Sequence, residues 1–488
     1  MPRKITEYFL YRHRYIIGYV FLVLVILGGF AVALLYVPGG ISQEEIKAST
    51  ETSALSIKDF QPEMVVNLPY YLLQRASFAV LGVSNISIKL PSMILAISTA
   101  AGLYMLLRHW FKNSTAIPAT VIAITSPQFI FMAQNGTPMI LFSSLSIWLI
   151  LISTFVIWHK RPAILWQLAL FCIVALIMYV PLGVYLVLAL CTTLVFHPHV
   201  RSHFKRLPRP KLAISAGLGA ILLAPLAYAI YKDWTILRSL FGIPATLPDI
   251  GANTLRLLND WFNFISPTTG ILITPVYSLS ITLLMILGIY RLSHVRYTAR
   301  SYLTWAWIIL LIPLIVINPN LGDASFIIMA ILVAQSLSLL LTNWWYKLFP
   351  LNPYARLIGM LLVSALVFGI VSSNIYRYVY STFYSPLIAK NFSKDLTVLN
   401  SEVNKYSHGG TPPTVVVTKD QYSFYHLVSI HSKKFNVSTS PENITSSTII
   451  ITHDAMKNHP NLGEPTKIIT TGIYENSDRF YVYNNGKK

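Results

Sequence analysis

Residues 138–158 read PMILFSSLSIWLILISTFVIW, an apolar run without a charged residue. The hydrocarbon core of a bilayer is about 30 Å thick, so a helix needs roughly 20 apolar residues to cross it. The same criterion finds eleven runs in the chain, near 15–36, 89–107, 116–133, 138–158, 163–179, 182–196, 212–231, 271–290, 302–318, 324–342 and 356–379. We therefore expect a mainly α, polytopic membrane protein with about eleven transmembrane helices.

The composition of the 488 residues supports this prediction. Hydrophobic residues make up 54% and charged residues 11%, with a mean hydropathy of +0.58, whereas soluble domains carry about 25% charged residues. The net charge of +19 is scattered between the apolar runs, which favours membrane topology over nucleic-acid binding. The two cysteines, Cys172 and Cys191, lie inside apolar runs, so we expect neither a disulfide framework nor a thiolate metal site.

The basic residues predict the orientation. The first run is too long for the core of a signal peptide and lacks a small-residue cleavage site, so we expect a retained helix. With a cytoplasmic N-terminus, the loops on the inside hold Arg3, Lys4, Arg12, Arg14, Arg108, Lys112, Lys160, Arg161, Arg201, Lys205, Arg206, Arg209, Lys211, Arg291, Arg296, Arg300, Lys347 and Arg356. The outside loops hold chiefly Lys47, Lys58, Arg75, Lys232, Arg238 and Arg256. The positive-inside rule thus predicts a multi-pass protein of the plasma or inner membrane, with its C-terminus outside.

Three outside segments are long: a first loop (38–88), a second loop (232–270) and the tail. We expect residues 1–380 to form a transmembrane module that includes both loops, and residues 381–488 to form an extracytoplasmic domain. The mixed apolar and polar stretches 68–73 and 254–258 predict amphipathic helices in the membrane interface. In the tail, strand-like runs at 414–417, 447–451, 467–470 and 480–483 alternate with helical or turn-rich stretches, which predicts a small α/β domain.

Two adjacent carboxylates, Glu44 and Glu45, follow the first helix in the sequence PGGISQEEI (38–46). Carboxylates near a membrane surface are costly to desolvate, so the pair is a candidate functional site. The alternative is a helix start in which Ser42 caps the first turn and glutamates are favourable there. The spacing alone leaves both interpretations open.

Further motifs follow in the same loop. The stretch Leu68-Pro69-Tyr70-Tyr71 is similar to a Pro-Pro-Leu-Tyr-Tyr element, and residues 81–92, LGVSNISIKLPS, are similar to Phe-Gly-x-Ser-x-x-Ser-x-Arg-Leu-Pro-Ser. Together with Glu44-Glu45-Ile46 in place of an Asp-Glu pair, and with Thr125-Ser126-Pro127 farther on, these motifs make the chain resemble a known family. This is the protein O-mannosyltransferase superfamily of C-type (GT-C) membrane glycosyltransferases, whose bacterial members include the lipid A aminoarabinose transferase.

The resemblance covers most of the chain and is most specific over residues 38–92. It implies a GT-C fold and an inverting transfer of a hexose, such as mannose, from a polyprenyl monophosphate to an extracytoplasmic acceptor hydroxyl of a protein, lipid or glycan. It also implies that Glu44 is the general base, because the acceptor hydroxyl loses its proton as it attacks, and that Glu45 orients Glu44 or the acceptor. The motif residues Pro69, Tyr70 and Tyr71 are then candidates for contact with the acceptor.

The leaving phosphate calls for cations where negative charge develops. The candidates on the predicted outer side are Arg256 and Arg238, followed by Lys232, Lys58 and Arg75. We expect no metal or other cofactor, because the first loop contains no Asp-x-Asp motif and this type of enzyme is not organised around a bound metal. The partners that we expect are the lipid-linked sugar, membrane lipid and the acceptor.

The sequence departs from the family at several positions. Glu44 replaces the usual Asp, and Asn67, Gln134-Asn135 and residues 318–323 stand where relatives carry basic residues. Two alternatives therefore stay open. One is a transporter or flippase of a lipid-linked intermediate, although the chain shows no internal repeat of the kind common in transporters. The other is a non-catalytic member of the family that acts as a scaffold.

Overall fold

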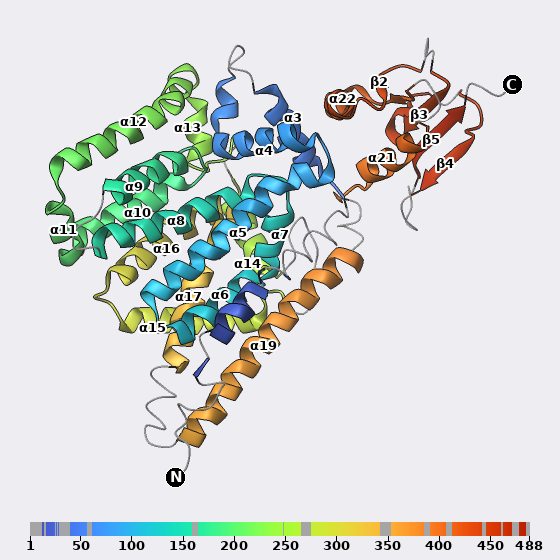
Figure 1. Ribbon diagram of the computed structural model, residues 1–488. Coiled ribbons are helices and arrows are strands. Elements are labelled where there is room, and N and C mark those ends of the chain that lie inside the picture. Colours follow the sequence, from blue (N-terminus) through green and yellow to red (C-terminus); the bar gives the residue numbers. More distant parts are fainter. Residues whose placement is uncertain are drawn as a thin grey trace. The chain divides into compact units, whose positions relative to one another are not determined.

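The computed structural model describes residues 12–13, 16–24, 26, 28, 40–55, 61–158, 164–246, 248–264, 275–341, 353–384, 391–406, 412–441, 446–459, 462–470 and 478–484. The chain forms two compact units (Figure 1). Unit 1 comprises Met1–Ala33, Phe60–Pro69 and Ser92–Ile388, and unit 2 comprises Leu34–Asp59, Tyr70–Pro91 and Ala389–Lys488.

Unit 1 is a bundle of apolar helices. Its described elements are η2 (Pro62–Val65), most of α5 (Asn85–Trp110), α6 (Asn113–Ile124), α7 (Pro127–Gln134), α8 (Met139–Trp158), α9 (Ile164–Ile177), α10 (Gly183–Phe196), α11 (Pro198–Lys205), α12 (Arg209–Lys232), α13 (Thr235–Leu240), α14 (Ile250–Phe262), α15 (Leu279–His294), α16 (Ala299–Ile317), η3 (Pro319–Ser325), α17 (Phe326–Ser338) and α19 (Pro353–Tyr384). Helix α9 packs between α8 and α12, α10 packs against α16, and α15 packs against α17 (Figure 1).

The prediction of a polytopic membrane protein is confirmed. Within the described residues, six helices are long and apolar enough to cross a membrane, or up to eight if each of two bent helix pairs is one span. Two further predicted runs form the shorter apolar helices α9 and α15. The first predicted run, 15–36, lies partly outside the described residues.

The run 116–133, expected as one helix, is broken into α6 and α7 with a bend of 60°. Ser126 caps α7 by accepting a hydrogen bond from the Phe129 N–H, and Pro127 begins the new helix. Proline has no N–H to continue the hydrogen bonding of α6, and it suits the first turn of a helix. The Ser-Pro turn therefore divides this run. A second break, of 93°, separates α10 from α11 at Pro198.

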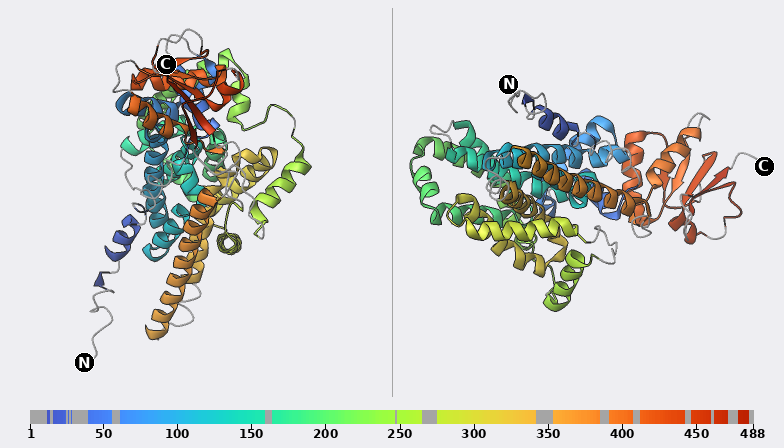
Figure 2. Two further views of the ribbon diagram at one scale, coloured as in Figure 1. Left: turned by 90° about the vertical axis from the view of Figure 1, so that its right-hand side faces the viewer. Right: turned by 90° about the horizontal axis from the view of Figure 1, so that it is seen from below.

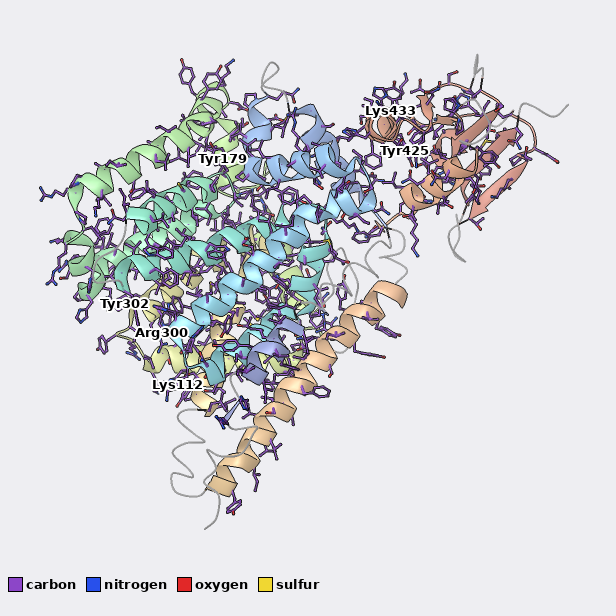
Figure 3. All side chains as sticks on the ribbon, viewed as in Figure 1. Lys112, Tyr179, Arg300, Tyr302, Tyr425 and Lys433 are labelled. Carbon is purple, nitrogen blue, oxygen red and sulfur yellow. The ribbon has the colours of Figure 1, made fainter. Side chains whose placement is uncertain are left out.

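In unit 1, segments that connect the helices and were predicted to lie on the same side of the membrane contact each other. At one end, the Arg300 guanidinium donates to the Trp110 carbonyl at 2.7 Å. At the other end, the Asn67 N–H donates to the Tyr179 carbonyl at 2.8 Å. Figure 3 shows Lys112 and Arg300 at one end of unit 1 and Tyr179 at the opposite end. Each of these hydrogen bonds therefore joins two segments that were predicted to lie on the same side of the membrane. The identity of the cytoplasmic side stays a prediction.

Unit 2 contains a five-stranded sheet in the order β2-β1-β3-β5-β4. The strands are β1 (Thr414–Val416), β2 (Asn436–Ser438), β3 (Thr448–Thr452), β4 (Lys467–Thr470) and β5 (Asp478–Asn484). Strand β1 is parallel to β2 and β3, and β5 is antiparallel to β3 and β4. All four predicted strands are present. Strand β2 was not predicted, because its three residues with one apolar side chain are fewer than the four to eight that a recognisable strand pattern needs.

Helices cover both faces of this sheet. Successive side chains of β1 point to opposite faces, and the apolar ones on each face pack against helices. Val415 and Val417 pack in a core with α21 (Asp395–Tyr406) and α22 (Lys419–Ser432), whereas Val416 packs in a cluster that includes α23 (His453–Lys457). Both views of Figure 2 show the sheet with its helices. The tail is the small α/β domain that the sequence predicts.

The first loop contributes to unit 2. Its helices are α3 (Gln43–Ala54) and α4 (Leu68–Leu81), the latter from Tyr70 onward. Ile41, Phe78, Val83 and Ile88 are buried in one apolar core with α21, α22 and the sheet. The domain boundary expected at residue 380 follows membrane topology, whereas the compact units follow packing. Burial of these apolar side chains joins the loop to the tail, although long stretches of sequence separate them.

Candidate active site

The acidic pair lies in the first turn of α3. Ser42 is the N-cap: its hydroxyl accepts from the Glu45 N–H at 3.2 Å, and its own N–H donates to Glu45 Oε2 at 2.7 Å. This reciprocal arrangement is a capping box, which satisfies two N–H groups that a helix start otherwise leaves open. The expected Ser42 cap is therefore present, and it engages only one carboxylate of the pair.

Glu45 is fully buried and faces Lys89, which is only 4% exposed. The Lys89 ammonium lies 3.6 Å from Glu45 Oε1 and donates to the Gly40 carbonyl at 2.7 Å. Lys89 belongs to the 81–92 motif, where it stands in place of the family's arginine. A buried charge persists when it is paired and hydrogen-bonded, so this ion pair joins two loop motifs and holds the start of α3.

Glu44 differs from its neighbour in exposure and in contacts. Its side chain is exposed, and it makes no hydrogen bond or ion pair with any residue that the structure describes. It also lies in the first turn of α3, where the helix dipole stabilises a negative charge. Of the two carboxylates, Glu44 is thus the one that a substrate can reach.

The tyrosines of the Pro69-Tyr70-Tyr71 motif point into the protein. Tyr70 is fully buried and Tyr71 is 7% exposed. The Tyr71 hydroxyl donates to Glu51 Oε2 at 2.8 Å, which joins α4 to α3. Burial, and then the charge of Glu51, raise the pKa of Tyr71 above its usual range, so the phenol stays protonated. Tyr71 therefore ties α4 to the helix that carries the acidic pair, and contact between the motif and an acceptor stays a prediction.

Of the basic candidates in unit 2, Arg75 is exposed and donates to the Leu55 carbonyl at the end of α3. This contact leaves its guanidinium at the surface while it ties α4 to α3. Lys58 lies outside the described residues.

The basic candidates in unit 1 are Lys232, Arg238 and Arg256, and all three are exposed. Arg238 donates to the Ala245 carbonyl, which closes the turn after α13. Arg256 lies 3.6 Å from Asp260, one turn farther along α14. Because Arg256 is exposed and Asp260 only half-buried, a pair of this kind contributes little to stability, and a role of Arg256 in phosphate binding stays a prediction.

A polar network that no sequence motif predicted surrounds η3, the segment where relatives carry a basic residue. The Gln128 amide of α7 donates to the Gly322 carbonyl at 3.4 Å, and the Tyr277 and Ser325 hydroxyls lie 2.7 Å apart. Gln128 and Ser325 are each 3% exposed and Tyr277 is 2% exposed. Buried polar groups need partners, so these contacts fix η3 against α7. In the sequence, the uncharged amide of Gln128 within an apolar run is the one sign of these contacts.

Two asparagines complete this network. The Asn253 amide of α14 donates to the carbonyls of Val316 and Ile317 at 3.1 and 3.2 Å, and the Asn318 amide donates to the Gly242 carbonyl at 3.2 Å. Helix α14 is the amphipathic helix expected around 254–258, and none of its residues is buried. Asn253 therefore holds the helix of Arg256 against the end of α16.

Among the residues that the structure describes, no three His, Cys, Asp or Glu side chains gather in a way that suits a metal ion. The expectation that catalysis needs no metal stays a prediction.

Comparison with known proteins confirms the resemblance. A family model described as dolichyl-phosphate-mannose-protein mannosyltransferase matches residues 68–228. The structure is similar to ArnT from Cupriavidus metallidurans bound to undecaprenyl phosphate, with a TM-score of 0.53 and 11% identity over 95% of this chain and 98% of that chain. AglB, the archaeal oligosaccharyltransferase from Archaeoglobus fulgidus in complex with an inhibitory peptide and a dolichol-phosphate, matches with a TM-score of 0.45 and 10% identity over 90% of this chain and 70% of that chain. A comparison with curated proteins finds no match. The similarity to ArnT shows that the fold is that of a polytopic GT-C membrane protein.

Proposed function

We propose that this protein is an inverting glycosyltransferase that moves a sugar from a polyprenyl monophosphate to an acceptor hydroxyl on the extracytoplasmic side. The observation that carries the proposal is the division between the two glutamates: Glu45 is buried with Lys89, and Glu44 is exposed at the same helix start. The family match over residues 68–228 and the fold shared with ArnT support the reaction class.

In this mechanism Glu44 is the general base. The acceptor oxygen attacks the anomeric carbon from the face opposite the phosphate, its proton passes to Glu44, and the bond between the anomeric carbon and the phosphate oxygen breaks. Attack from the opposite face inverts the anomeric configuration, and polyprenyl phosphate leaves with the bonding electron pair. A base placed in this way contributes about 10²–10⁴-fold to the rate.

Glu45 is a positioning residue. Its carboxylate caps α3 through the Ser42 N–H and pairs with Lys89, so it sets where the first turn of α3 begins and which way Glu44 points. Small displacements of a catalytic group are costly. A buried pair therefore preserves the placement of an exposed base.

For the donor phosphate, Arg256 is the leading candidate, because its side chain is exposed and, among the residues that the structure describes, pairs with Asp260 at 3.6 Å. Arg238 is second, since its guanidinium also supports the turn at Ala245. Lys232, Lys58 and Arg75 complete the set of candidates. The donor sugar is proposed to be a hexose such as mannose.

The experiment combines native mass spectrometry with a transfer assay on the purified protein in detergent. The probes are polyprenyl phosphate and polyprenyl-phosphate hexoses, and the variants are Glu44→Gln, Arg256→Ala and, as a matched control, Glu63→Gln, which alters an exposed carboxylate of η2. We expect Glu44→Gln to keep donor binding but lose transfer by about 10²–10⁴-fold, and Arg256→Ala to weaken binding by about tenfold.

If Glu44→Gln transferred the sugar at the wild-type rate, Glu44 would not be the general base. Movement of the lipid across reconstituted vesicles without any acceptor would favour a flippase instead, and failure to bind any of these lipids would favour a non-catalytic scaffold.

A further inference from the structure

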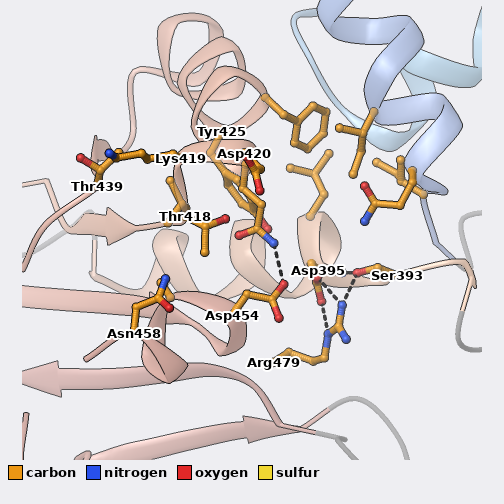
Figure 4. Close-up of a pocket in the computed structure, with 18 of the residues that line it drawn as sticks. Ser393, Asp395, Thr418, Lys419, Asp420, Tyr425, Thr439, Asp454, Asn458 and Arg479 are labelled. Carbon is orange, nitrogen blue, oxygen red and sulfur yellow. Dashed lines mark hydrogen bonds and ion pairs between the residues drawn. The ribbon is translucent and has the colours of Figure 1, made fainter. Parts of the chain in front are cut away.

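Unit 2 contains a cleft of about 760 Å³ that the proposed transfer reaction does not use. Its lining includes Val417 and Thr418 after β1, Thr439 after β2, and Asp454 after β3. These strands are parallel, so their carboxyl ends meet at one edge of the sheet (Figure 4). Open sheets of this kind bind ligands outside the carboxyl ends of their strands. The position of the cleft is therefore that of a ligand site.

The floor of the cleft is an ordered ion pair. The Arg479 guanidinium donates to both oxygens of Asp395, at 2.6 and 2.5 Å, and to the Ser393 hydroxyl at 2.9 Å (Figure 4). Hydrogen bonds from Arg479 to Asp395 raise the pKa of the guanidinium, so this pair stays charged. A bidentate pair has a defined geometry and gives the cleft a rigid base.

The walls of the cleft carry both hydrogen-bond donors and hydrogen-bond acceptors. Asp420 and Lys419 occupy the first turn of α22, and both are exposed. Asp454 accepts from the Gln421 amide at 2.9 Å, which leaves its second oxygen toward Lys457 at 3.5 Å. The Asn458 amide and the Thr439 hydroxyl add further donors and acceptors to the lining.

This mixture identifies the class of ligand. Asp420 and Asp454 disfavour an anion and Lys419 disfavours a cation, while the charge of Arg479 is already paired with Asp395. A neutral ligand rich in hydroxyl groups satisfies both kinds of wall, because each hydroxyl donates one hydrogen bond and accepts others. We propose that this cleft binds a neutral saccharide, held by the carboxylates of Asp420 and Asp454 and by the neighbouring amide and hydroxyl side chains.

The first loop forms one wall of the same cleft. Ile41, Gln43 and Ile46 line it, and Ile41 is held to Ser393 by paired backbone hydrogen bonds of 2.8 and 3.0 Å. Gln43 directly precedes Glu44 in the first turn of α3. A saccharide in the cleft therefore lies beside the helix start that carries the proposed base, although its binding requires neither the donor lipid nor the transfer reaction.

The test uses the full-length protein in a detergent without a sugar headgroup. Binding of methyl α-mannopyranoside, methyl β-glucopyranoside and N-acetylglucosamine is followed by ligand-observed NMR, with inorganic phosphate and triglycine amide as probes of the other chemistries. For a small ligand of this size we expect a Kd on the order of 1 mM. The double variant Asp420→Asn with Asp454→Asn is expected to raise the Kd about tenfold or more, because it replaces two charged acceptors.

The matched control is Glu464→Gln, the same chemical change at an exposed carboxylate before β4 and outside the cleft lining, and it should bind as the wild type does. A second variant, Thr439→Trp, adds a large side chain at an exposed position of the lining and should abolish binding without altering the ion pair.

Three results would overturn the proposal: no binding of any glycoside, glycoside binding that survives both cleft variants, or binding of phosphate or the peptide alone. The NMR binding measurement contains no lipid-linked donor sugar, so it can also be made with the Glu44→Gln variant. Failure of the transfer assay and failure of this binding assay are thus distinct.

Discussion

Lys89 lies with its ammonium 3.6 Å from Glu45 Oε1, and both side chains are almost completely buried, with exposures of 5% and 0%. The two residues belong to separate motifs of the first loop, at the start of α3 and in the first turns of α5. Removing one partner of a buried pair leaves an uncompensated charge in a region of low dielectric constant. The pair thus makes a strong prediction about stability.

We expect Lys89→Met to destabilise the protein by about 3–5 kcal/mol. The measurement is the apparent unfolding temperature of the detergent-solubilised protein. The double variant Glu45→Gln with Lys89→Met should recover much of the loss, because no charge is then left buried.

The control for this prediction is Lys47→Met. Lys47 lies 3.8 Å from Glu51 with its side chain 78% exposed, and such surface pairs contribute only about 0–1 kcal/mol. Equal losses in Lys47→Met and Lys89→Met would show that the buried pair has no special role.

The second prediction concerns the length of the Glu44 side chain. Glu44→Asp restores the residue that relatives carry, but it withdraws the carboxylate by one methylene from a backbone arranged for glutamate. A displacement of this order costs about 10²-fold in rate, so we expect transfer to fall by about that factor while donor binding is unchanged. Single-turnover transfer with saturating donor measures it. Transfer equal to or faster than wild type would mean that the site is shaped for the shorter side chain.

The third prediction tests the packing of α15 on α17. Gly288 is buried, and a Cβ at this position would collide with the Leu332 backbone. Small residues allow membrane helices to approach closely, so we expect Gly288→Ala to destabilise the protein by about 1–3 kcal/mol. Thermal unfolding in detergent measures the change.

Gly217→Ala is the matched control, because Gly217 in α12 has nothing within 4 Å of an added Cβ. Alanine in such an open helical position stabilises by about 0.4–1 kcal/mol. If Gly288→Ala also stabilised the protein, the close contact between α15 and α17 would be in doubt.

The fourth prediction concerns pH. Burial favours the neutral form of Glu402, but hydrogen bonds from Lys405 and Lys467 outweigh burial and lower its pKa from the ordinary value of 4.5. A carboxyl whose folded-state pKa is depressed stabilises the fold above its unfolded pKa and loses this effect as pH falls through the folded pKa. We therefore expect the α21 and β4 region to lose stability as pH falls below about 4.5.

Hydrogen–deuterium exchange of peptides from α21 and β4 measures this effect. In Glu402→Gln these peptides should exchange faster than in the wild type at neutral pH, because the free energy of local opening falls by about 1 kcal/mol. The difference in exchange rate between variant and wild type should shrink in acid. Glu464→Gln, which alters an exposed carboxylate, should follow the wild type throughout. A difference between Glu402→Gln and wild type that persists unchanged in acid would exclude the carboxylate as its source.

Local patterns in the sequence were sufficient to predict much of the fold. The length of each apolar run predicts a membrane helix, and the β-branched and aromatic runs at 414–417 and 480–483 predict strands β1 and β5, because both signals depend on residues that are near neighbours in the chain. The Ser42 cap is also local, since its partner Glu45 is three residues away. The break between α6 and α7 is encoded at Ser126-Pro127, but the hydropathy of the surrounding run conceals it.

Interactions between distant segments were decided by the tertiary structure. The sequence presents Glu44 and Glu45 as equivalent neighbours, and only the approach of Lys89 separates a buried pair from an exposed carboxylate. The cleft likewise combines α3, the ends of β1 and β3, and Arg479 of β5. Sequence by itself determined most of the helices, strands and apolar runs, because hydropathy and backbone preference act locally. Folding decided which side chains meet, because burial of apolar surface brings together residues that no local pattern relates.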